Sequence, residues 1–258
     1  MTTRPAESSP LTPVIITGGA SGIGLASAHA LAAAGRAVAL WDIDSAAAAK
    51  AAEAISEAYG VRAAGIPVDL RSIDAIGPAL SASCDAVGRP GGLVHAAGVV
   101  DTASIDGLTQ ESWDLGIAVH LRALAFIVQA IRPHLAAQPG SAIVAIASIN
   151  ATLGNAMNPV YSAAKGGILS LVRSLADRLA QDGIRINSVS PGQIMTPMLR
   201  PAVEALPEGF FERRILLGRL GEPEELGKVV RFLLSDDASY ITAAELVVDG
   251  GNISSQRG

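Results

Sequence analysis

A serine, a tyrosine and a lysine in the segment SINATLGNAMNPVYSAAK (148–165) have residue types and spacing suited to proton transfer. Tyr161 and Lys165 are four positions apart in a helical pattern, so they project from the same face. A tyrosine with a pKa of about 10 is a poor base at neutral pH, but a nearby ammonium group favours its phenolate. Tyr161 is therefore a candidate general base, and Ser148 could hydrogen-bond a substrate oxygen. Taken alone, a tyrosine and a lysine at this spacing are usually a half-buried ring and a solvated amine.

A glycine-rich turn, TGGASGIG (17–24), follows the β-branched run VIIT and precedes a helical pattern. Such a turn directs free backbone N–H groups and the positive end of a helix at an anion, so a pyrophosphate is a natural ligand. Gly18, Gly22 and Gly24 have the spacing G-x-x-x-G-x-G, which differs from the G-x-G-x-x-G fingerprint. By itself the turn could also be a tight connection.

Asp42 closes the next expected strand, 24 residues after Gly18, where a carboxylate can accept hydrogen bonds from the adenosine ribose hydroxyls. A carboxylate about 4 Å from a 2′-phosphate repels it by about 4 kcal/mol per charge at an effective dielectric of about 20, and by less where it is exposed. Neither Ser21 nor Ile43 offers a compensating cation. The sequence therefore predicts NAD rather than NADP, the alternative being a solvated aspartate like Asp44.

Short β-branched runs alternate with alanine- and leucine-rich helical periodicities along the chain, which is typical of parallel βαβ units. Strands are expected at 14–17, 37–41, 92–95, 142–147, 184–190 and 245–248, with another near 61–68. Helices are expected at about 22–34, 45–59, 72–87, 110–136, 160–182 and 223–235. With right-handed crossovers, these elements predict one doubly wound α/β domain with helices on both faces of the sheet.

Composition indicates a globular protein with a small-molecule partner. Half of the residues are hydrophobic, 17% are charged, and the net charge of −5 gives no footprint for nucleic acid. Cys84 is the only cysteine, which fits a reducing compartment. Every apolar run is broken before the length of a membrane span, so we expect no membrane partner and a cytoplasmic location. Residues 1–12 are expected to form a disordered lead-in without the apolar region of a secretory signal.

With TGGASGIG, Asp42, Ser148 and YSAAK (161–165), the chain resembles the single-domain short-chain dehydrogenases/reductases over essentially its entire length. The further matches are AAG (96–98), INSVSPGQIMTP (186–197), GRLGEPEELGKVVRFLLSDDASYIT (218–242) and VVDGG (247–251). The resemblance implies a Rossmann-type fold with a seven-stranded sheet over 13–258. It also implies transfer of a hydride between a secondary alcohol carbon and the nicotinamide of NAD.

The resemblance also implies a role for each matching residue. Tyr161 becomes the acid/base, Lys165 lowers the Tyr161 pKa and binds the nicotinamide ribose, and Ser148 orients the substrate. Asp69 matches the acid that contacts the adenine amine. The expected cofactor-binding residues are Gly18, Ser21, Gly22, Ile23, Gly24, Asp42, Asp69, Leu70, Ala97, Gly98, Tyr161, Lys165, Pro191, Gly192, Ile194 and Thr196, the last two matching positions that hold the carboxamide.

Two positions depart from the family pattern. The motif NNAG reads HAAG here, so Ala96 replaces an asparagine that steadies the central sheet. The motif VNL reads VHL, which puts His120 in place of the asparagine that holds a water connecting Lys165 to solvent. A histidine donates or accepts hydrogen bonds and titrates near neutrality, so His120 is expected to sustain an altered proton relay. The four histidines lack metal-ligand spacing, and no metal is expected.

The substrate is expected to lie over the nicotinamide, beneath a mobile lid at about 196–216. Met198, Leu199, Phe210 and Phe211 would make this lid apolar, which suits a hydrophobic alcohol or ketone. Polar side chains beside the site suit a diol or sugar alcohol instead. The expected substrate contacts are Ser148, Asn150, Asn155, Gln193 and Met198.

Several alternatives stay open. A 3-oxoacyl or other ketone reductase would share every catalytic residue with an alcohol dehydrogenase. A nucleotide-binding regulator that has lost catalysis finds its support in His120 and Ala96. The helical patterns at 110–136 and 160–182 are apolar over wide arcs, which predicts a subunit interface. The family resemblance implies a homotetramer, with a dimer as the alternative.

Overall fold

The computed structural model describes residues 10–254, so residues 1–9 of the lead-in expected over 1–12 lie outside the described residues. A seven-stranded sheet, parallel throughout, forms the centre with the order β3-β2-β1-β4-β5-β6-β7. The strands are β1 (Val14–Thr17), β2 (Val38–Asp42), β3 (Ala63–Pro67), β4 (Gly92–His95), β5 (Ala142–Ile146), β6 (Arg185–Pro191) and β7 (Glu245–Val248). The predicted doubly wound α/β fold is confirmed.

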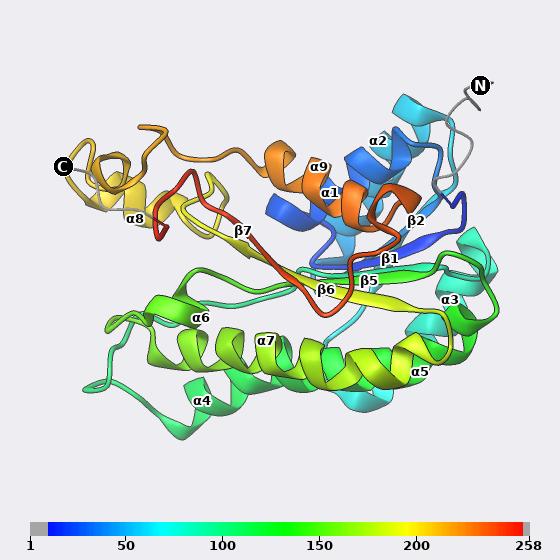
Figure 1. Cartoon of the computed structure of the whole chain (residues 1–258), viewed down its shortest axis with the longest axis horizontal. Coiled ribbons are helices and arrows are strands. Elements are labelled where there is room, and N and C mark those ends of the chain that lie inside the picture. The colour runs from blue at the N-terminus through cyan, green and yellow to red at the C-terminus, as the bar shows by residue number, and fades with distance from the viewer. Residues whose placement is uncertain (1–9, 255–258) are drawn as a thin grey trace.

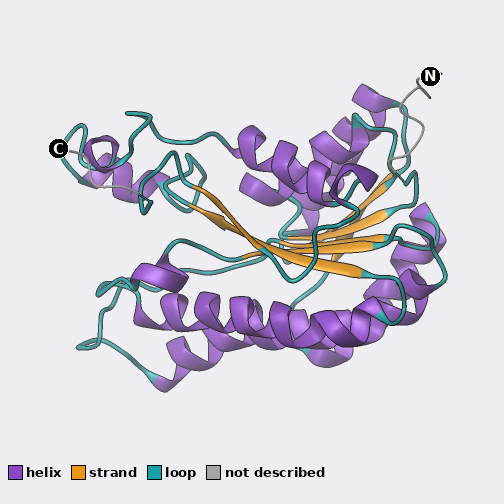
Figure 2. Cartoon of the chain, viewed as in Figure 1, coloured by secondary structure: helices purple, strands orange, loops and turns teal. Residues whose placement is uncertain are grey.

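Helices cover both faces of the sheet (Figures 1 and 2). They are α1 (Gly22–Ala32), α2 (Ser45–Tyr59), α3 (Ile76–Val87), α4 (Gln110–Ile117), α5 (Ala123–Ala136), α6 (Asn150–Leu153), α7 (Pro159–Ala180), α8 (Arg200–Ala205) and α9 (Pro223–Leu233). Figure 1 shows α1, α2 and α9 on one face, and α3, α4, α5 and α7 on the other. Successive strand residues point to opposite faces, so each strand supplies both apolar cores.

The alternation is plain in β1. Val14 and Ile16 belong to the buried cluster under α1 and α9, whereas Ile15 belongs to the cluster under α5 and α7. Burial of each such side chain contributes about 1.5–3 kcal/mol, so the two clusters fix the strand faces and the register. The chain leaves β1 towards β2 on one side and returns to β4 on the other, which creates a crevice at the carboxyl ends of β1 and β4.

The single helix expected over 110–136 is interrupted. A π-helical turn, Ala118–Arg122, separates α4 from α5, and the backbone N–H of Ala123 donates to the carbonyl of Ala118, five residues earlier. Hydrophobic periodicity averages over several turns, so it cannot reveal one widened turn. Among the described residues this stretch alone is long and apolar enough to cross a membrane. Half of its most apolar window is buried, and it packs as a core helix.

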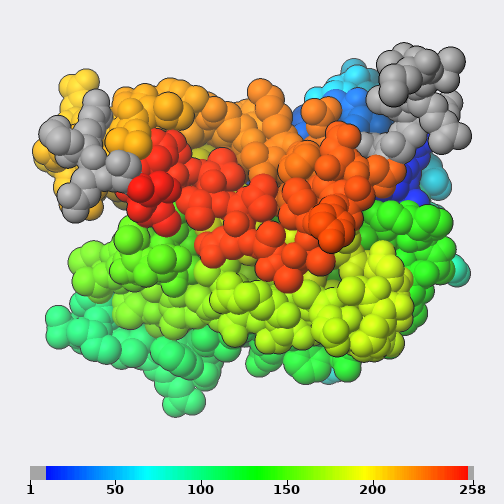
Figure 3. All heavy atoms as spheres, in the orientation of Figure 1, coloured from blue at the N-terminus to red at the C-terminus, as the bar shows by residue number. Residues whose placement is uncertain are grey.

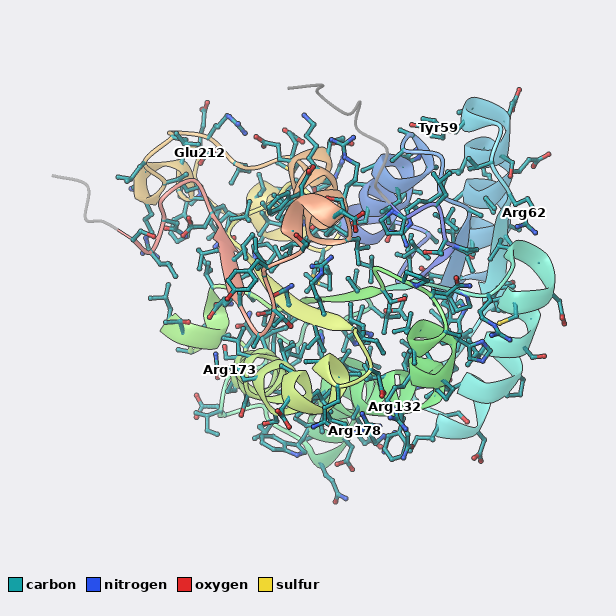
Figure 4. All side chains as sticks on the ribbon, turned by 45° about the vertical axis from the view of Figure 1, so that its right-hand side comes forward. Tyr59, Arg62, Arg132, Arg173, Arg178 and Glu212 are labelled. Atoms are coloured by element: carbon teal, nitrogen blue, oxygen red, sulfur yellow. The ribbon has the colours of Figure 1, made fainter. Side chains whose placement is uncertain are left out.

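Ion pairs connect two helices of the layer formed by α3, α4, α5 and α7. Arg132 of α5 and Arg178 of α7 both donate to the carboxylate of Asp182, at 2.8 and 2.9 Å. Figure 4 shows the two arginines near one another on this layer. These bonds join α5 to the end of α7, the helix that carries Tyr161 and Lys165 in its first turns.

Candidate active site

A cavity of about 340 Å³ opens at the carboxyl ends of four neighbouring strands. Gly18 follows β1, Asp42 ends β2, Ala97 follows β4 and Ile146 ends β5, and all four line it. In doubly wound sheets this crevice is where ligands bind.

Most of the predicted site residues line this cavity. They are Gly18, Ser21, Gly22, Ile23, Gly24, Asp42, Asp69, Leu70, Ala97, Gly98, His120, Tyr161, Lys165, Thr196 and Met198. The predicted residues outside its lining are Ser148, Asn150, Asn155, Pro191, Gly192, Gln193 and Ile194. Lining residues that sequence reasoning did not assign to the site are Trp41, Ile43, Val68, Arg71, Ala96, Val99, Leu115, Val119, Ile146 and Pro197. Most of these are apolar, and an apolar pattern does not distinguish a cavity wall from a core.

The glycine loop packs too closely for side chains. Gly18 has φ +64°, and a Cβ there would lie 2.8 Å from the Cα of Ala97. A Cβ on Gly24 would overlap the Gly18 carbonyl oxygen. Helix α1 begins at Gly22, and among the described contacts Ser21 makes no side-chain capping bond to its first turn. The N–H groups of that turn are therefore available to an anion in the cavity.

Asp42 is held in place by the backbone. Its carboxylate accepts from the N–H of Ala20 in the glycine loop and from the N–H of Asp44, each at 3.1 Å. Asp44 has another task, because its carboxylate accepts from Ala47 at 2.9 Å and caps α2. The two acids of WDID thus differ, and only Asp42 lines the cavity.

Asp69 is already paired. Arg71 donates to its carboxylate through the guanidinium, at 2.6 Å at the closest, and through its own backbone N–H at 2.9 Å. These bonds hold the pKa of Asp69 below its usual value. An adenine amine would share this carboxylate with Arg71, which the sequence analysis had not assigned to the site.

Lys165 is buried and Tyr161 is half-buried, both near Ser148. The Lys165 Nζ donates to the carbonyl of Ile146 at 2.6 Å and lies 5.4 Å from the centre of the Tyr161 ring. Burial lowers the pKa of Lys165 to about 7. Burial raises the pKa of Tyr161, and a hydrogen bond with Ser148 opposes this. The expected lowering of the Tyr161 pKa by Lys165 is not found, because desolvation disfavours the charged form of both groups.

His120 is fully buried, and its ring fills the space beside Gly98, where a Cβ would come within 2.5 Å of Cε1. The ring meets the Tyr161 ring edge-on, with centres 5.4 Å apart. Burial, followed by the charge of Lys165, lowers the pKa of His120 well below its usual value. The ring is therefore neutral at pH 7, and the expected titration near neutrality is not found.

The Nε2 atom of His120 faces the backbone of one residue. It lies 2.7 Å from the carbonyl oxygen of Val99 and 3.2 Å from the Val99 nitrogen. A protonated Nε2 donates to the carbonyl, and an unprotonated Nε2 accepts from the N–H, so both neutral tautomers have a partner. The Nδ1 atom is buried and has no partner among the described residues.

A second, smaller cavity of about 50 Å³ shares Val99, Leu115 and Tyr161 with the first. It is also lined by Asp101, whose Oδ1 accepts from the backbone of Ala103 at 2.9 Å. The Oδ2 atom of Asp101 is buried and has no hydrogen-bond partner within residues 10–254. The sequence analysis missed Asp101, because an isolated aspartate in a loop gives no signal of burial.

The segment expected to be a lid, at about 196–216, contributes few residues to the cavity lining. Thr196 and Met198 line the cavity, whereas Phe210 and Phe211 pack edge-on against each other, 5.2 Å apart. The N–H of Leu217 donates to the carbonyl of Gly250 at 3.1 Å. Figure 3 shows the red C-terminal residues against this amber segment.

Comparison with known proteins agrees with this geometry. Residues 18–252 match the family model described as enoyl-(acyl carrier protein) reductase. The chain is 36% identical over 240 residues to the "Probable galactose dehydrogenase GalD" of Rhizobium meliloti (strain 1021), with 92% of this chain and 93% of the relative covered. The chain belongs to the short-chain dehydrogenase/reductase family.

Two more members of this family resemble the chain closely. The L-rhamnose 1-dehydrogenase (NAD(P)(+)) of Azotobacter vinelandii (strain DJ / ATCC BAA-1303) is 37% identical over 244 residues, with 92% of this chain and 95% of the relative covered. The L-sorbose reductase of Gluconobacter frateurii, solved with NADPH and L-sorbose, has a TM-score of 0.89 at 27% identity and covers 96% and 98% of the two chains. The protein is therefore an oxidoreductase of alcohol or ketone substrates that uses a nicotinamide dinucleotide.

The burial of the Lys165 amine predicts how the free energy of unfolding depends on pH. Its pKa is about 7 in the folded protein and 10.5 when exposed to solvent, so the unfolded chain binds more protons between these values. The free energy of unfolding should therefore rise from pH 7 to 9, by up to about 1.4 kcal/mol per pH unit. Urea unfolding at several pH values measures this rise, which Lys165→Met should remove. The exposed-site control Lys50→Met should keep it, and a wild-type protein without the rise would contradict the prediction.

Proposed function

We propose that the protein is an NAD-dependent dehydrogenase that transfers a hydride between a secondary alcohol carbon and NAD, with Tyr161 as the acid/base. The observation that carries this proposal is that one cavity joins the glycine loop at Gly18 to Tyr161 and the buried Lys165. An anion site and a proton-transfer group in the same crevice suit the oxidation of an alcohol by a dinucleotide.

The chain's own residues supply the proton chemistry. NAD, when bound, provides the carbon that accepts the hydride. Tyr161, ionised once its own proton has passed towards Lys165, accepts the proton of the substrate hydroxyl, and Ser148 stabilises the substrate oxygen through its own hydroxyl. Lys165 uses one N–H for Ile146, so two remain for the ribose and the relay. Because its pKa is about 7, it can gain or lose a proton at physiological pH.

The preference for NAD rests on Asp42. Its carboxylate, held by the backbone, would repel a 2′-phosphate. The neighbouring Ile43 is apolar, and Arg71, a cation in the same cavity lining, is paired with Asp69. Relatives are named with NAD(P)+ or solved with NADPH, so family membership alone leaves both cofactors possible. The charge at this position supports NAD for this chain.

For the substrate we propose a secondary alcohol that carries at least one further hydroxyl group, as a diol or sugar alcohol does. Asp101 supports this choice, because its buried Oδ2 lacks a donor beside a cavity that touches Tyr161. Asn150 in α6, another expected substrate contact, lines neither cavity; it donates to Asn158 at 3.5 Å, a weak bond that a substrate hydroxyl could replace. A ketone reductase working in the opposite direction remains the alternative.

The enzyme is further proposed to be a cytoplasmic homotetramer, or a dimer. Large apolar side chains remain exposed on the helical layer formed by α4 and α5, among them Trp113 at 43% and Phe126 at 38%. A second copy would bury them, as expected for a subunit interface.

Replacement of Tyr161 by phenylalanine tests the proposed activity. NADH formation at 340 nm, measured over monohydric alcohols, diols and polyols, should fall by about 10²–10⁴-fold in Tyr161→Phe, the usual contribution of a general acid/base. Calorimetry should show that NAD binding is retained. The control Tyr59→Phe removes a hydroxyl at the end of α2 that bonds only to His29 among the recorded contacts, and it should keep full activity (Figure 4). A wild-type protein that binds NAD but oxidises no alcohol would favour the alternative of a nucleotide-binding regulator that has lost catalysis.

Replacement of Asp42 by serine tests the cofactor preference. The wild-type ratio of kcat/KM for NAD to that for NADP should be at least about tenfold, and Asp42→Ser should reduce it by about tenfold or more, because repulsion of the 2′-phosphate is removed. Asp44→Ser is the matched control, since Asp44 caps α2 and does not line the cavity. An unchanged ratio in Asp42→Ser would exclude this role for Asp42.

His120 is proposed to hold, at the Nδ1 that lacks a partner among the described residues, a water that carries protons between Lys165 and solvent, while Nε2 donates to the Val99 carbonyl. His120→Ala should lower kcat about tenfold at pH 7, where proton release depends on the relay. The loss should shrink towards pH 10, where hydroxide can accept the proton directly. The kcat of wild type and His120→Ala, measured from pH 7 to pH 10, tests both expectations. Unchanged turnover in the variant across this range would rule the relay out.

A further inference from the structure

A second buried histidine lies behind the active site. His95, the last residue of β4, is 1% exposed and does not line the cavity. Its Nδ1 lies 3.0 Å from Oγ1 of Thr17, the last residue of β1, and its Nε2 lies 3.0 Å from the carbonyl oxygen of His120. The imidazole thus bridges the start of the glycine loop and the π-helical turn.

The partners of Thr17 fix the direction of these bonds. Its Oγ1 accepts from the backbone N–H of Ala97 at 3.1 Å and shares the N–H of Ala96 with the Thr17 carbonyl, each at 3.2 Å. Because these N–H groups face the lone pairs of Oγ1, the hydroxyl proton is directed to Nδ1 of His95, which is then unprotonated. The ring hydrogen therefore sits on Nε2 and is donated to the His120 carbonyl. Burial lowers the pKa of His95 to about 4, which keeps this neutral tautomer at physiological pH.

The π-helical turn gains from an outside donor. In a π turn the backbone bonds join residues five apart, as Ala123 and Ala118 do here, and where the pattern changes back to bonds four apart a carbonyl loses its helical donor. Buried carbonyls without a donor are costly, and the N–H of His95 supplies a donor in this turn, to the carbonyl of His120 and beside that of Val119. His95 therefore stabilises the widened turn against a regular α-helical turn.

The widened turn determines where His120 points. Each residue advances an α-helix by about 100°, so closing the turn by one residue would rotate the ring away from Gly98, Val99 and Tyr161. The ring position needed for the relay thus depends on a bond made by the backbone of the same residue.

We propose that His95 is a positioning residue of the active site, which couples Thr17 at the start of the cofactor loop to the π-helical turn that aims His120 at Tyr161. The effect on turnover rests on the proposed dehydrogenase function, whereas the effect on His120 does not.

Two substitutions at the same position separate the two bonds. In His95→Asn the short amide can reach Thr17 as Nδ1 does, but it has no group at the position of Nε2. In His95→Gln the longer amide brings an N–H towards the His120 carbonyl. We expect kcat to fall about tenfold in His95→Asn with less than about twofold change in the KM for the alcohol, and His95→Gln to recover most of this loss. Asn187→Ala, which removes buried bonds to Ile241 and Ala244, should lower thermal stability alone.

A spectroscopic measurement tests the coupling without any substrate. In ¹⁵N-histidine-labelled protein with NAD, two-bond correlation spectra should show the Nε2–H tautomer of His95 from pH 6 to 8. The ring signals of His120 should shift in His95→Asn and return towards wild type in His95→Gln, while those of His134 stay fixed. An Nδ1–H tautomer of His95, or unchanged His120 signals in His95→Asn, would overturn the proposal. If the wild type oxidises no alcohol, the proposed function fails and these spectra still decide the role of His95.

Discussion

The close approach of the ends of β1 and β4 is the constraint on which the rest of the site depends. Thr17 and His95 are register partners in adjacent parallel strands, and one residue later the backbone of Gly18 meets that of Ala97. No side chain fits at this contact, so the phosphate loop needs glycine there. The same contact brings a loop suited to an anion within reach of the helices on the opposite face, where Tyr161 is carried.

Burial sets the chemistry of the site more than any ion pair does. His95, His120 and Lys165 all have lowered pKa values, and that of Tyr161 is raised, in each case first of all because the charged form loses solvent. Burial therefore favours the neutral forms of these groups, and small changes in local charge decide which group holds a proton. Hydrogen bonds to fixed backbone carbonyls, at Ile146 and Val99, keep these groups in place without adding charge.

Much of this arrangement could be predicted from the sequence. Alternating strand and helix patterns gave the doubly wound sheet, and the ordered motifs brought the glycine loop, Asp42, Tyr161 and Lys165 to one cavity. The π-helical turn could not be predicted, because one extra residue in a turn barely alters hydrophobic periodicity. The pKa directions and the unpaired oxygen of Asp101 could not be predicted either, since both depend on which neighbours exclude water.

The backbone of Val99 has a consequence for reversibility. It offers an acceptor and a donor to the same nitrogen of His120, so neither tautomer is left without a bond. The neutral ring can therefore present Nδ1 as an acceptor in one tautomer and as a donor in the other, without rotating. A water at Nδ1 is then held equally well in either orientation, so the ring imposes no preferred direction on proton flow, and the concentrations of alcohol, ketone and the two cofactor forms decide which way the enzyme runs.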